Sequence, residues 1–498
     1  MMARTSTTPL LARLAAPTSF ALAAWLALAG TAGAATPGVD EPPLAGPAAA
    51  LVLPPIVVRT LDNGLTVIVA RRSATPLVTV SVRLRAGAER DDAGRAGLAD
   101  LTATLLARGT LRHGKPLATV DIARQAETLG GDLSSGSGFG SSEVALTVTT
   151  PHAGDALGLL ADLVRHPTFP EAEFKRTVDE KLDELRLAMS SPGRVASQAA
   201  RRAYWGDSPY GASVTPASLA RVTRADVQRF HAQMYRPDAA AIVFAGDIDE
   251  ATAMALAREQ FGDWKAPATA LPAVAMTAPA SKAPALVAID LGGVGQSGVA
   301  VAAPFVPLGA PERYVASVAN AVLGGGYSAR LNEEIRIKRG LAYGAGSRGD
   351  SQPAGGVVFA QAQTNNPTAG QVVDLVRAQL ADLGKTAPPA DELAARQATL
   401  VGSFGRQLDT TSSFADLVGN QWTRGLPMAD LGVYTERVMA VTPEQVRDFA
   451  ASHWTPQSLR VVVAGDQSKN GEGLKKAAPD GVFVKVADVD FEKATLVK

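Results

Sequence analysis

Two side chains in the second half of the chain, Arg336 and Tyr343, have types and a spacing that could serve catalysis. They lie in the stretch GGGYSARLNEEIRIKRGLAY, which runs from Gly324 to Tyr343. A guanidinium and a phenolic hydroxyl both donate hydrogen bonds to negative charge, so the pair looks like part of an active site. A run such as NEEIRIKRG is also typical of a solvated helix face, and spacing alone leaves both interpretations open.

The surrounding residues predict one helix that leads into one strand. Ser328 is suited to cap the helix start, acidic residues occupy its early turns, and basic residues occupy its last turn, an arrangement that complements the helix dipole. Gly340 can adopt the left-handed conformation that ends a helix, and residues 341–343 can leave as a strand. Arg336 then lies beside the apolar stripe of this helix rather than opposite it.

The composition excludes several classes of protein. Lys+Arg and Asp+Glu balance at 48 each, so the chain has no basic excess for a nucleic acid and no polybasic patch for a membrane. It contains no cysteine, which excludes disulfides, thiolate zinc sites, cysteine catalysis and lipid attachment at an N-terminal cysteine. A length of 498 residues predicts two or more domains.

The first 34 residues have the pattern of a secretory signal peptide. Two arginines precede an apolar run from Ser19 to Gly30, and Ala32-Gly33-Ala34 forms a small-residue cleavage site. The run is shorter than the roughly 20 residues that span a bilayer, which favours cleavage over an uncleaved anchor. We therefore expect a bacterial periplasmic protein, in which residues 35–55 form a poorly ordered lead-in rich in Ala and Pro.

Residue periodicity predicts alternating strands and helices after this lead-in. Strands are expected at 66–69, 78–84 and 144–148, and helices at 97–109, 120–129, 156–163 and 171–189. The first two strands are expected to be joined around Ser73 to Pro76.

An internal repeat is the strongest organisational signal. Residues 222–247 align without a gap on residues 441–466, with ten of 26 positions identical at a constant offset of 219. Chance would give about two identities in such a window. Each copy reads as a Thr-capped helix, an aromatic residue, a proline and an apolar strand that ends in Ala-Gly-Asp, so the chain contains a duplicated α+β domain.

An Ala/Pro-rich segment at 266–284 separates the two copies and is expected to be a linker. The predicted organisation is a signal peptide at 1–34, a lead-in at 35–55, a first domain at 56–265, this linker, and a second domain at 285–498 that carries Arg336 and Tyr343.

From about Thr60 to Asp466 the chain resembles the insulysin and pitrilysin family of zinc peptidases, which includes the mitochondrial processing peptidase. The motifs that carry the resemblance are LDNGLTVIVA, RAGAERD, AGLADLTATLLARGT, SPYGASVTPASLARVT and the Arg336 to Tyr343 stretch. The resemblance implies two similar α+β domains, each an antiparallel sheet packed with helices, that form half of a clamshell. It also implies that Arg336 and Tyr343 reach the zinc site of another domain and contact substrate near the scissile bond.

The zinc-binding half of such a site is missing from the sequence. Family members that hold zinc carry His-x-x-Glu-His, whose imidazoles bind the ion while the Glu acts as base on its water. Asp100, Ala103 and Thr104 stand in those places here. The third ligand of the family would fall near Glu184, and one carboxylate does not make a site. The five histidines lie at least 14 residues apart and offer no substitute: His113, His152, His166, His231 and His453.

The segment that holds peptide substrates in catalytic relatives also departs from expectation. In those relatives an exposed edge strand of the zinc-bearing domain pairs with the substrate, and residues 132–143 (DLSSGSGFGSSE) occupy that place here. The many Gly and Ser residues make this a flexible, weakly specified edge, so we assign no binding residues to it.

The resemblance thus implies a zinc-free subunit of a periplasmic heterodimeric metalloendopeptidase. A homologous partner subunit would carry the zinc, and this chain would bind no cofactor of its own. Tyr343 would donate a hydrogen bond to the developing oxyanion, and Arg336 would orient the peptide or strengthen that donation. The alternative is a pseudo-peptidase that binds peptides or serves as a scaffold without hydrolysis.

Overall fold

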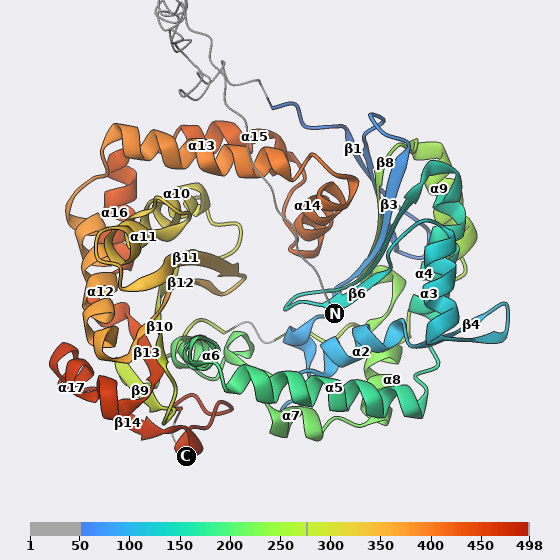
Figure 1. The fold of residues 1–498 in the computed structure, drawn as a ribbon. Coiled ribbons are helices and arrows are strands. Elements are labelled where there is room, and N and C mark those ends of the chain that lie inside the picture. The colour runs from blue at the N-terminus through green and yellow to red at the C-terminus, as the bar shows by residue number, and fades with distance from the viewer. Residues whose placement is uncertain (1–50, 275–276, 497–498) are drawn as a thin grey trace, which may run out of the picture. The chain divides into compact units, whose positions relative to one another are not determined.

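The computed structural model describes residues 51–274 and 277–496. Its elements form two halves, each built around one six-stranded sheet (Figure 1). The strands of the first half are β1 (Ile56–Thr60), β2 (Thr66–Arg71), β3 (Leu77–Leu84), β4 (Gly109–Arg112), β5 (Lys115–Ala118), β6 (Ser134–Ser137), β7 (Ser142–Thr149) and β8 (Ala240–Gly246). Its helices are α2 (Leu98–Leu106), α3 (Thr119–Thr128), α4 (Ala153–Arg165), α5 (Glu171–Met189), α6 (Pro192–Trp205), α7 (Pro216–Ala220), α8 (Arg224–Met234) and α9 (Glu250–Phe261).

The second half repeats this plan. Its strands are β9 (Leu286–Asp290), β10 (Gln296–Phe305), β11 (Ala342–Gln352), β12 (Gly355–Asn365), β13 (Arg460–Gly465) and β14 (Val482–Lys485). Its helices are α10 (Arg313–Gly324), α11 (Arg330–Asn332), α12 (Ala369–Lys385), α13 (Ala390–Arg406), α14 (Thr411–Thr423), α15 (Ala429–Met439), α16 (Pro443–His453) and α17 (Gln467–Ala477).

The two sheets share the order of five strands, while the outer strand comes first in the chain in one sheet (β1) and last in the other (β14). The first is β1-β2-β8-β3-β7-β6, and the second, read in the equivalent direction, is β14-β9-β13-β10-β12-β11. Most neighbours are antiparallel, but β8 runs parallel to β2, and β13 and β14 run parallel to β9. The prediction of two homologous α+β domains is therefore confirmed, and the sheets are mixed rather than purely antiparallel.

The helix that opens each repeated segment is fixed by the same local device. The hydroxyl of Thr223 accepts a hydrogen bond from the N–H of Asp226 at the start of α8, and Thr442 accepts one from Gln445 at the start of α16. In both cases the side chain three residues on bonds back to the threonine N–H, which completes a capping box.

Each half also covers the sheet of the other half with a helix (Figure 1). Apolar residues of α6 pack against the second sheet, where Val195 contacts the core that contains Val287 and Val462. Val418 of α14 belongs to the core that covers the first sheet. The offset of 219 places α14 on α6 in the sequence, so this exchange is reciprocal, and the core of each half is incomplete without the other.

One sequence expectation changes in the first sheet. The strands β2 and β3 do follow each other around Ser73 to Pro76, but β8 lies between them and pairs with both. All seven residues of β8 are buried, and a strand buried on both faces takes a central place with a neighbour on each side.

The remaining domain boundaries stay predictions. The predicted signal peptide and all but residues 51–55 of the lead-in lie outside the described residues. Between α9 and β9, the described residues form no helix or strand. Among the helices that the structure describes, none combines the length and the apolar character needed to cross a bilayer.

Candidate functional site

Arg336 and Tyr343 are brought together at the surface of the second half. The Arg336 guanidinium carbon lies 4.9 Å from the centroid of the Tyr343 ring and 5.0 Å from that of Tyr327. Tyr343 is 90% exposed and Tyr327 66% exposed. A guanidinium is attracted to the electron-rich faces of both rings, so this Tyr–Arg–Tyr cluster is held without any ion pair.

The helix that carries Arg336 differs from the predicted one in two ways. It begins at Arg330 with Ala329 as its N-cap. Ser328 is not the cap, because its hydroxyl and carbonyl oxygens both accept hydrogen bonds from Arg396. From Glu333 to Ile337 the helix is π-helical, a wider turn that is often found at functional sites.

The predicted helix end is confirmed at Gly340, whose φ is +62°. The N–H of Gly340 bonds the carbonyl of Arg336, and the N–H of Leu341 bonds that of Ile335. The chain then turns directly into β11, and a break in register between Ala342 and Ala345 lies at Tyr343. This local geometry brings the Tyr343 ring back over Arg336.

A buried asparagine that the sequence analysis did not single out holds the cluster together. Asn332 is 3% exposed. Its amide nitrogen donates to the carbonyl of Tyr327 at 2.6 Å, and its carbonyl oxygen accepts from the N–H of Ala345 at 3.1 Å. Asn332 therefore ties the turn that carries Tyr327 to the strand that carries Tyr343. The aromatic residue after the triple glycine was the only sequence signal for this arrangement.

The charge of Arg336 has no carboxylate partner among the described residues. Glu334, in the same turn, is engaged by Lys338 at 2.5 Å and by Arg339. These hydrogen bonds lower the pKa of Glu334. The cluster thus presents one uncompensated guanidinium and two phenolic hydroxyls to solvent, which can donate hydrogen bonds to an anion.

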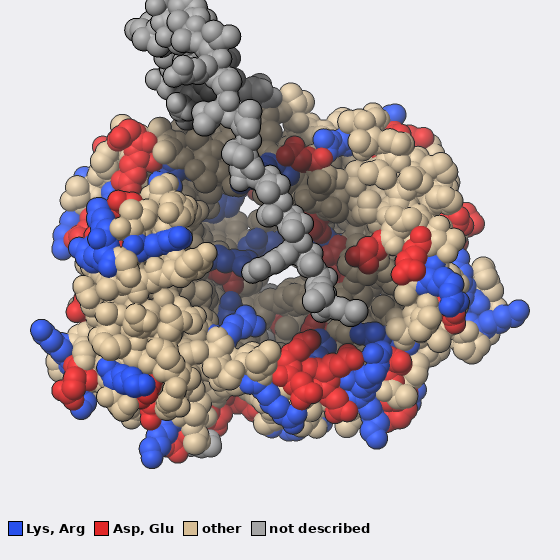
Figure 2. All heavy atoms as spheres, in the orientation of Figure 1, with Lys and Arg blue, Asp and Glu red and all other residues tan. Residues whose placement is uncertain are grey.

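The place of the zinc motif, in the first half, is closed by an ion pair. The ammonium nitrogen of Lys181, on α5, lies 2.5 Å from a carboxylate oxygen of Asp100, on α2. An ammonium group has no lone pair to offer a metal, and its charge repels a cation. Figure 2 shows the acidic side chains of this region gathered over α5, yet Lys181 is the residue of α5 that reaches Asp100.

The other two positions do not supply ligands either. Ala103 is fully buried and has no group that could accept a proton. The hydroxyl of Thr104 donates to the carbonyl of Asp100 at 2.8 Å, so it is engaged within its own helix. These residues do not fit a zinc ion, whose sites need several imidazole, thiolate or carboxylate donors.

The other predicted candidates do not come together. Glu184 is exposed on α5, and within the described residues no group of three or more His, Cys, Asp or Glu could hold a metal. His231 is half-buried, with its Nε2 at 2.8 Å from the carbonyl of Val164, and the desolvation of its ring lowers its pKa to about 4. His453 stacks on Phe449 with ring centroids 4.3 Å apart.

The helix of the lost zinc motif keeps a strong anchor at its start. The Asp91 carboxylate accepts hydrogen bonds from the N–H groups of Gly97 and Ala99, both at 2.7 Å, at the N-terminus of α2. Burial nevertheless raises the pKa of Asp91 to about 7. The helix is thus held in place although its metal ligands are absent.

The segment at 132–143 contains β6, which is the edge strand of the first sheet, and its last two residues begin the neighbouring strand β7. A pocket of about 410 Å³ lies next to it, lined in part by Arg83, Glu143 and Asn420. Arg83 is already paired with Glu143 of its own half at 2.5 Å and with Asp416 of the second half, so its charge is balanced by one carboxylate from each half. No described hydrogen bond, ion pair or ring contact joins Asp100 to Arg336 or Tyr343.

The family models place this arrangement in a known class. Residues 66–217 match the model described as insulinase, peptidase family M16, and residues 221–400 match the peptidase M16 inactive domain. Together the two matches cover most of the described chain. The chain belongs to the insulinase-like M16 peptidase family.

Relatives with curated names agree with this family. An uncharacterised zinc protease of Mycobacterium bovis is 27% identical over 289 residues, which cover 57% of this chain and 64% of the relative. The match thus spans less than two thirds of that relative. A Helicobacter pylori protein named non-peptidase homolog YmxG is 21% identical over 79% of this chain and 90% of the relative.

Solved structures support the fold. A peptidase M16 inactive domain from Pseudomonas fluorescens aligns with a TM-score of 0.75 at 25% identity and covers 82% of this chain and 98% of that structure. A structure described as a protease from Helicobacter pylori aligns with a TM-score of 0.77 at 20% identity, over 83% of this chain and all of that structure. The second likeness concerns the fold alone.

Proposed function

We propose that this chain is the zinc-free subunit of a heterodimeric metalloendopeptidase and supplies Arg336 and Tyr343 to a zinc site on a homologous partner subunit. Tyr343 donates a hydrogen bond to the oxyanion that develops at the scissile carbonyl. Arg336, stacked beside it, orients the peptide. Both groups act on negative charge that is greatest in the transition state, which is where such donors accelerate a reaction.

One observation carries this proposal: the Tyr–Arg–Tyr cluster is rigidly supported and yet unused within its own chain. Asn332 fixes the backbone on both sides of it, while the Tyr343 hydroxyl and the Arg336 guanidinium have no hydrogen-bond partner among the described residues. A buried support beneath exposed, unpaired donors is the arrangement expected of a preorganised binding group.

The proposal extends to the location and the partner. The signal-peptide pattern of residues 1–34 supports export to a bacterial periplasm. The mismatch between zinc and the Asp100–Lys181 pair supports a partner that provides the metal, because a complete site of this family needs both the ligands and the donors.

The alternative function is a pseudo-peptidase that binds peptides or acts as a scaffold. The Asp100–Lys181 pair favours it, because an ion pair in the place of the metal suits a chain that no longer hydrolyses anything. The Helicobacter pylori relative is named a non-peptidase homolog, which describes that protein as one without peptidase activity. This alternative gives no reason for the exposed donors of the Tyr–Arg–Tyr cluster.

The deciding experiment is purification of the chain from its native cell under mild conditions, followed by an assay for cleavage of an unstructured peptide. We expect chelator-sensitive cleavage only in fractions that also contain a chain with His-x-x-Glu-His and zinc. A chain that purifies alone, holds no metal, cleaves nothing and still binds the peptide would replace the subunit proposal with the pseudo-peptidase.

A further inference from the structure

A second pocket lies on the same strand as Tyr343, in the second half. It has a volume of about 310 Å³ and is lined by Gly324, Gly346, Ser347, Arg348, Phe359 and Gln361. Small-molecule sites typically measure about 300–1,000 Å³, so this pocket suits one or two amino-acid side chains rather than a large cofactor.

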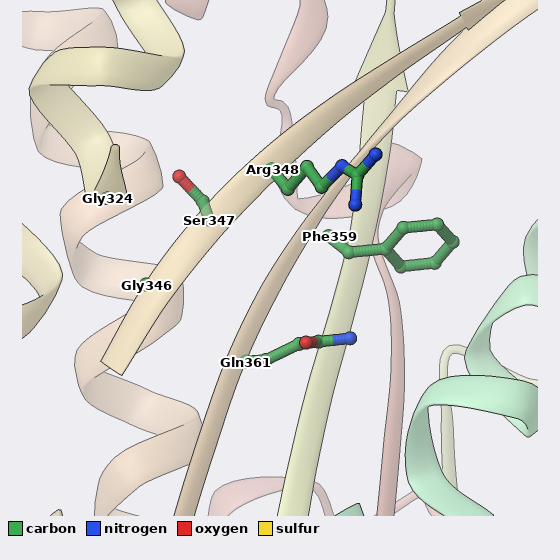
Figure 3. A pocket seen from close by; sticks show the side chains of 6 residues that line it. All are labelled: Gly324, Gly346, Ser347, Arg348, Phe359 and Gln361. Atoms are coloured by element: carbon green, nitrogen blue, oxygen red, sulfur yellow. The ribbon is translucent and has the colours of Figure 1, made fainter. Parts of the chain in front are cut away.

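The sheet register places three of these side chains on one face. Arg348 pairs directly with Phe359 across β11 and β12, and Gly346 pairs with Gln361 two positions along. Figure 3 shows Arg348, Phe359 and Gln361 pointing to the same side, while Ser347 points away from them. The Ser347 hydroxyl bonds Asn320 of α10 at 2.8 Å. A guanidinium, an aromatic ring and an amide therefore converge on one space.

Arg348 is the chemically unsatisfied member of this group. Its side chain is exposed and has no hydrogen bond, ion pair or ring contact with any residue that the structure describes. The nearest acid on the same face, Asp350, faces Arg201 at 3.5 Å and accepts a hydrogen bond from Gln352 at 3.0 Å. The Asp350 carboxylate is thus engaged with residues other than Arg348.

Further cations surround the pocket. Arg201 lies over the Phe359 ring at 5.2 Å, and Arg424 donates to the carbonyl of Ser351 at 2.9 Å. Of these two arginines and Arg348, only Arg201 pairs with the carboxylate of Asp350 among the described residues. Figure 2 shows basic side chains on the hollowed face beside the ends of β11 and β12. The local field favours a ligand with negative charge.

We propose that this pocket binds a carboxylate group of a peptide, from an acidic side chain or from the peptide C-terminus. The Arg348 guanidinium donates two parallel hydrogen bonds to the carboxylate. The second N–H of the Gln361 amide donates a further one, because its first is given to Ser197 at 2.9 Å. The Phe359 ring forms the apolar wall against the adjoining methylene groups.

This inference rests on the proposed function, and it names the class of substrate. Arg348 follows Tyr343 on β11 by five residues, about 15 Å along a strand. An extended peptide covers that distance in four or five residues. The peptides selected would therefore carry a carboxylate four or five residues from the bond that Tyr343 contacts.

The test is peptide binding to the purified full chain, measured by fluorescence anisotropy without any cleavage. The probes are a labelled unstructured peptide with one glutamate, its glutamine counterpart, and the C-terminal amide of each. The variant is Arg348→Gln. The control is Arg437→Gln, which removes the same charge from an exposed arginine of α15.

We expect Arg348→Gln to weaken binding of the acidic peptide about tenfold, the effect of one charge-assisted contact, while Arg437→Gln leaves binding unchanged. If the glutamine peptide binds weakly, the carboxylate comes from a side chain. If the amide binds weakly, it comes from the C-terminus. Equal effects of the two variants, or equal binding of all four peptides, would overturn the inference.

These outcomes are separable from those of the proposed function. A complex that never cleaves peptides, while binding still depends on Arg348 and on a carboxylate, contradicts the subunit proposal and leaves the pocket assignment standing. A complex that cleaves acidic and neutral peptides equally well, with or without Arg348, contradicts only the pocket assignment.

Discussion

The helix α2 in the first half and the turn from α11 to β11 in the second half carry opposite kinds of site. On α2, polar side chains at the motif positions are all engaged: Asp100 with Lys181 and Thr104 with the helix backbone. At the turn, the Arg336 guanidinium contacts two aromatic rings and has no carboxylate partner among the described residues, and Tyr343 is almost fully exposed. The polar groups of α2 thus find partners within the chain, while the donors of the turn have no hydrogen-bond partner among the described residues.

In this chain an ion pair fills the place of the zinc ligands, while the Tyr–Arg–Tyr cluster keeps its donors unpaired among the described residues. The Lys181–Asp100 pair joins α5 and α2, and an ion pair at such a partly exposed position contributes at most about 1 kcal/mol to stability. The Tyr–Arg–Tyr cluster adds no more than a similar amount, about 0.5–1 kcal/mol for a cation–π contact at an exposed site. Its position is nonetheless held by a buried asparagine, a residue type that is rarely buried without such a role.

The largest expected effect concerns catalysis in the complex with a zinc-bearing partner. Tyr343→Phe or Arg336→Ala should each reduce peptide cleavage by about two to three orders of magnitude, the usual effect of removing one donor to an oxyanion. Complex formation and the unfolding midpoint should stay the same, because neither side chain is buried. The measurement is turnover at saturating peptide.

The matched control is Arg339→Ala, in the same turn. The Arg339 guanidinium forms an ion pair with Glu334 and is not available to a substrate. Its loss should therefore leave cleavage unchanged. If all three variants cleave at the rate of the parent complex, the Tyr–Arg–Tyr cluster has no catalytic role and the contrast between the two halves disappears.

The next effect concerns zinc binding at α2. The triple change Asp100→His, Ala103→Glu and Thr104→His restores the motif but leaves the Lys181 ammonium in place. Adding Lys181→Glu replaces the ammonium, which is positive like zinc, with a carboxylate that can bind the ion. We therefore expect the affinity for zinc to rise by about tenfold to a hundredfold, the range found when supporting groups of zinc sites are changed. The measurement is bound zinc per chain after dialysis.

Lys181→Glu alone serves as the control and should bind no zinc, since it supplies no imidazole. One zinc per chain in the triple variant, with Lys181 still present, would mean that the ammonium does not occupy the place of the metal. The residues at positions 100, 103 and 104 would then be enough to explain why α2 lacks a zinc site.

Sequence reasoning succeeded where the signal is local or repeated. The offset of 219 between the two copies anticipated the shared strand order of the two sheets. Threonine caps and Gly340 marked helix ends correctly, because these residues act on backbone groups within one turn. Arg336 and Tyr343 were likewise found together, since a turn of a few residues joins them.

Contacts between distant elements could not be derived in the same way. Lys181 was missed as the partner of Asp100, because which turn of α5 faces α2 depends on how the two helices pack. Asn332 was missed because its partners are backbone groups of two different segments. Ser328 was expected as a cap, and Arg396 from α13 took its oxygens instead.

The exchange of α6 and α14 was also invisible to the sequence, and it predicts a matched pair of stability effects. Val195 on α6 and Val418 on α14 are both fully buried against the sheet of the other half. Val195→Ala and Val418→Ala should each lower the free energy of unfolding by about 2–3 kcal/mol, through lost burial and a cavity. The measurement is urea unfolding followed by circular dichroism.

Both variants should unfold in one transition, because each core contains residues of both halves. Val433→Ala, at a partly exposed position of α15, is the control and should change the free energy by less than about 0.5 kcal/mol. Two separate transitions, each shifted by one variant only, would show that the halves fold independently.

The smallest expected effect is a pH dependence that is confined to the first half. Asp91 has a folded pKa of about 7 against an ordinary value of 3.8, so the folded state binds its proton more tightly and this group adds stability as the pH falls from 7. His231 has a folded pKa of about 4 against 6.5, so it removes stability over nearly the same range. The two effects oppose each other, and the parent chain should show little change between about pH 5 and 6.5.

Asp91→Asn removes one side of this balance. The variant should lose stability as the pH falls from 6.5 to 5, because only His231 then takes up a proton on unfolding, with a slope of at most about 1.4 kcal/mol per pH unit. Urea midpoints at a series of pH values measure it. A profile that runs parallel to that of the parent chain would mean that the Asp91 carboxylate stays ionised at the start of α2, as its two backbone donors alone would favour. Burial would then weigh less in this half than the hydrogen bonds that anchor the helix.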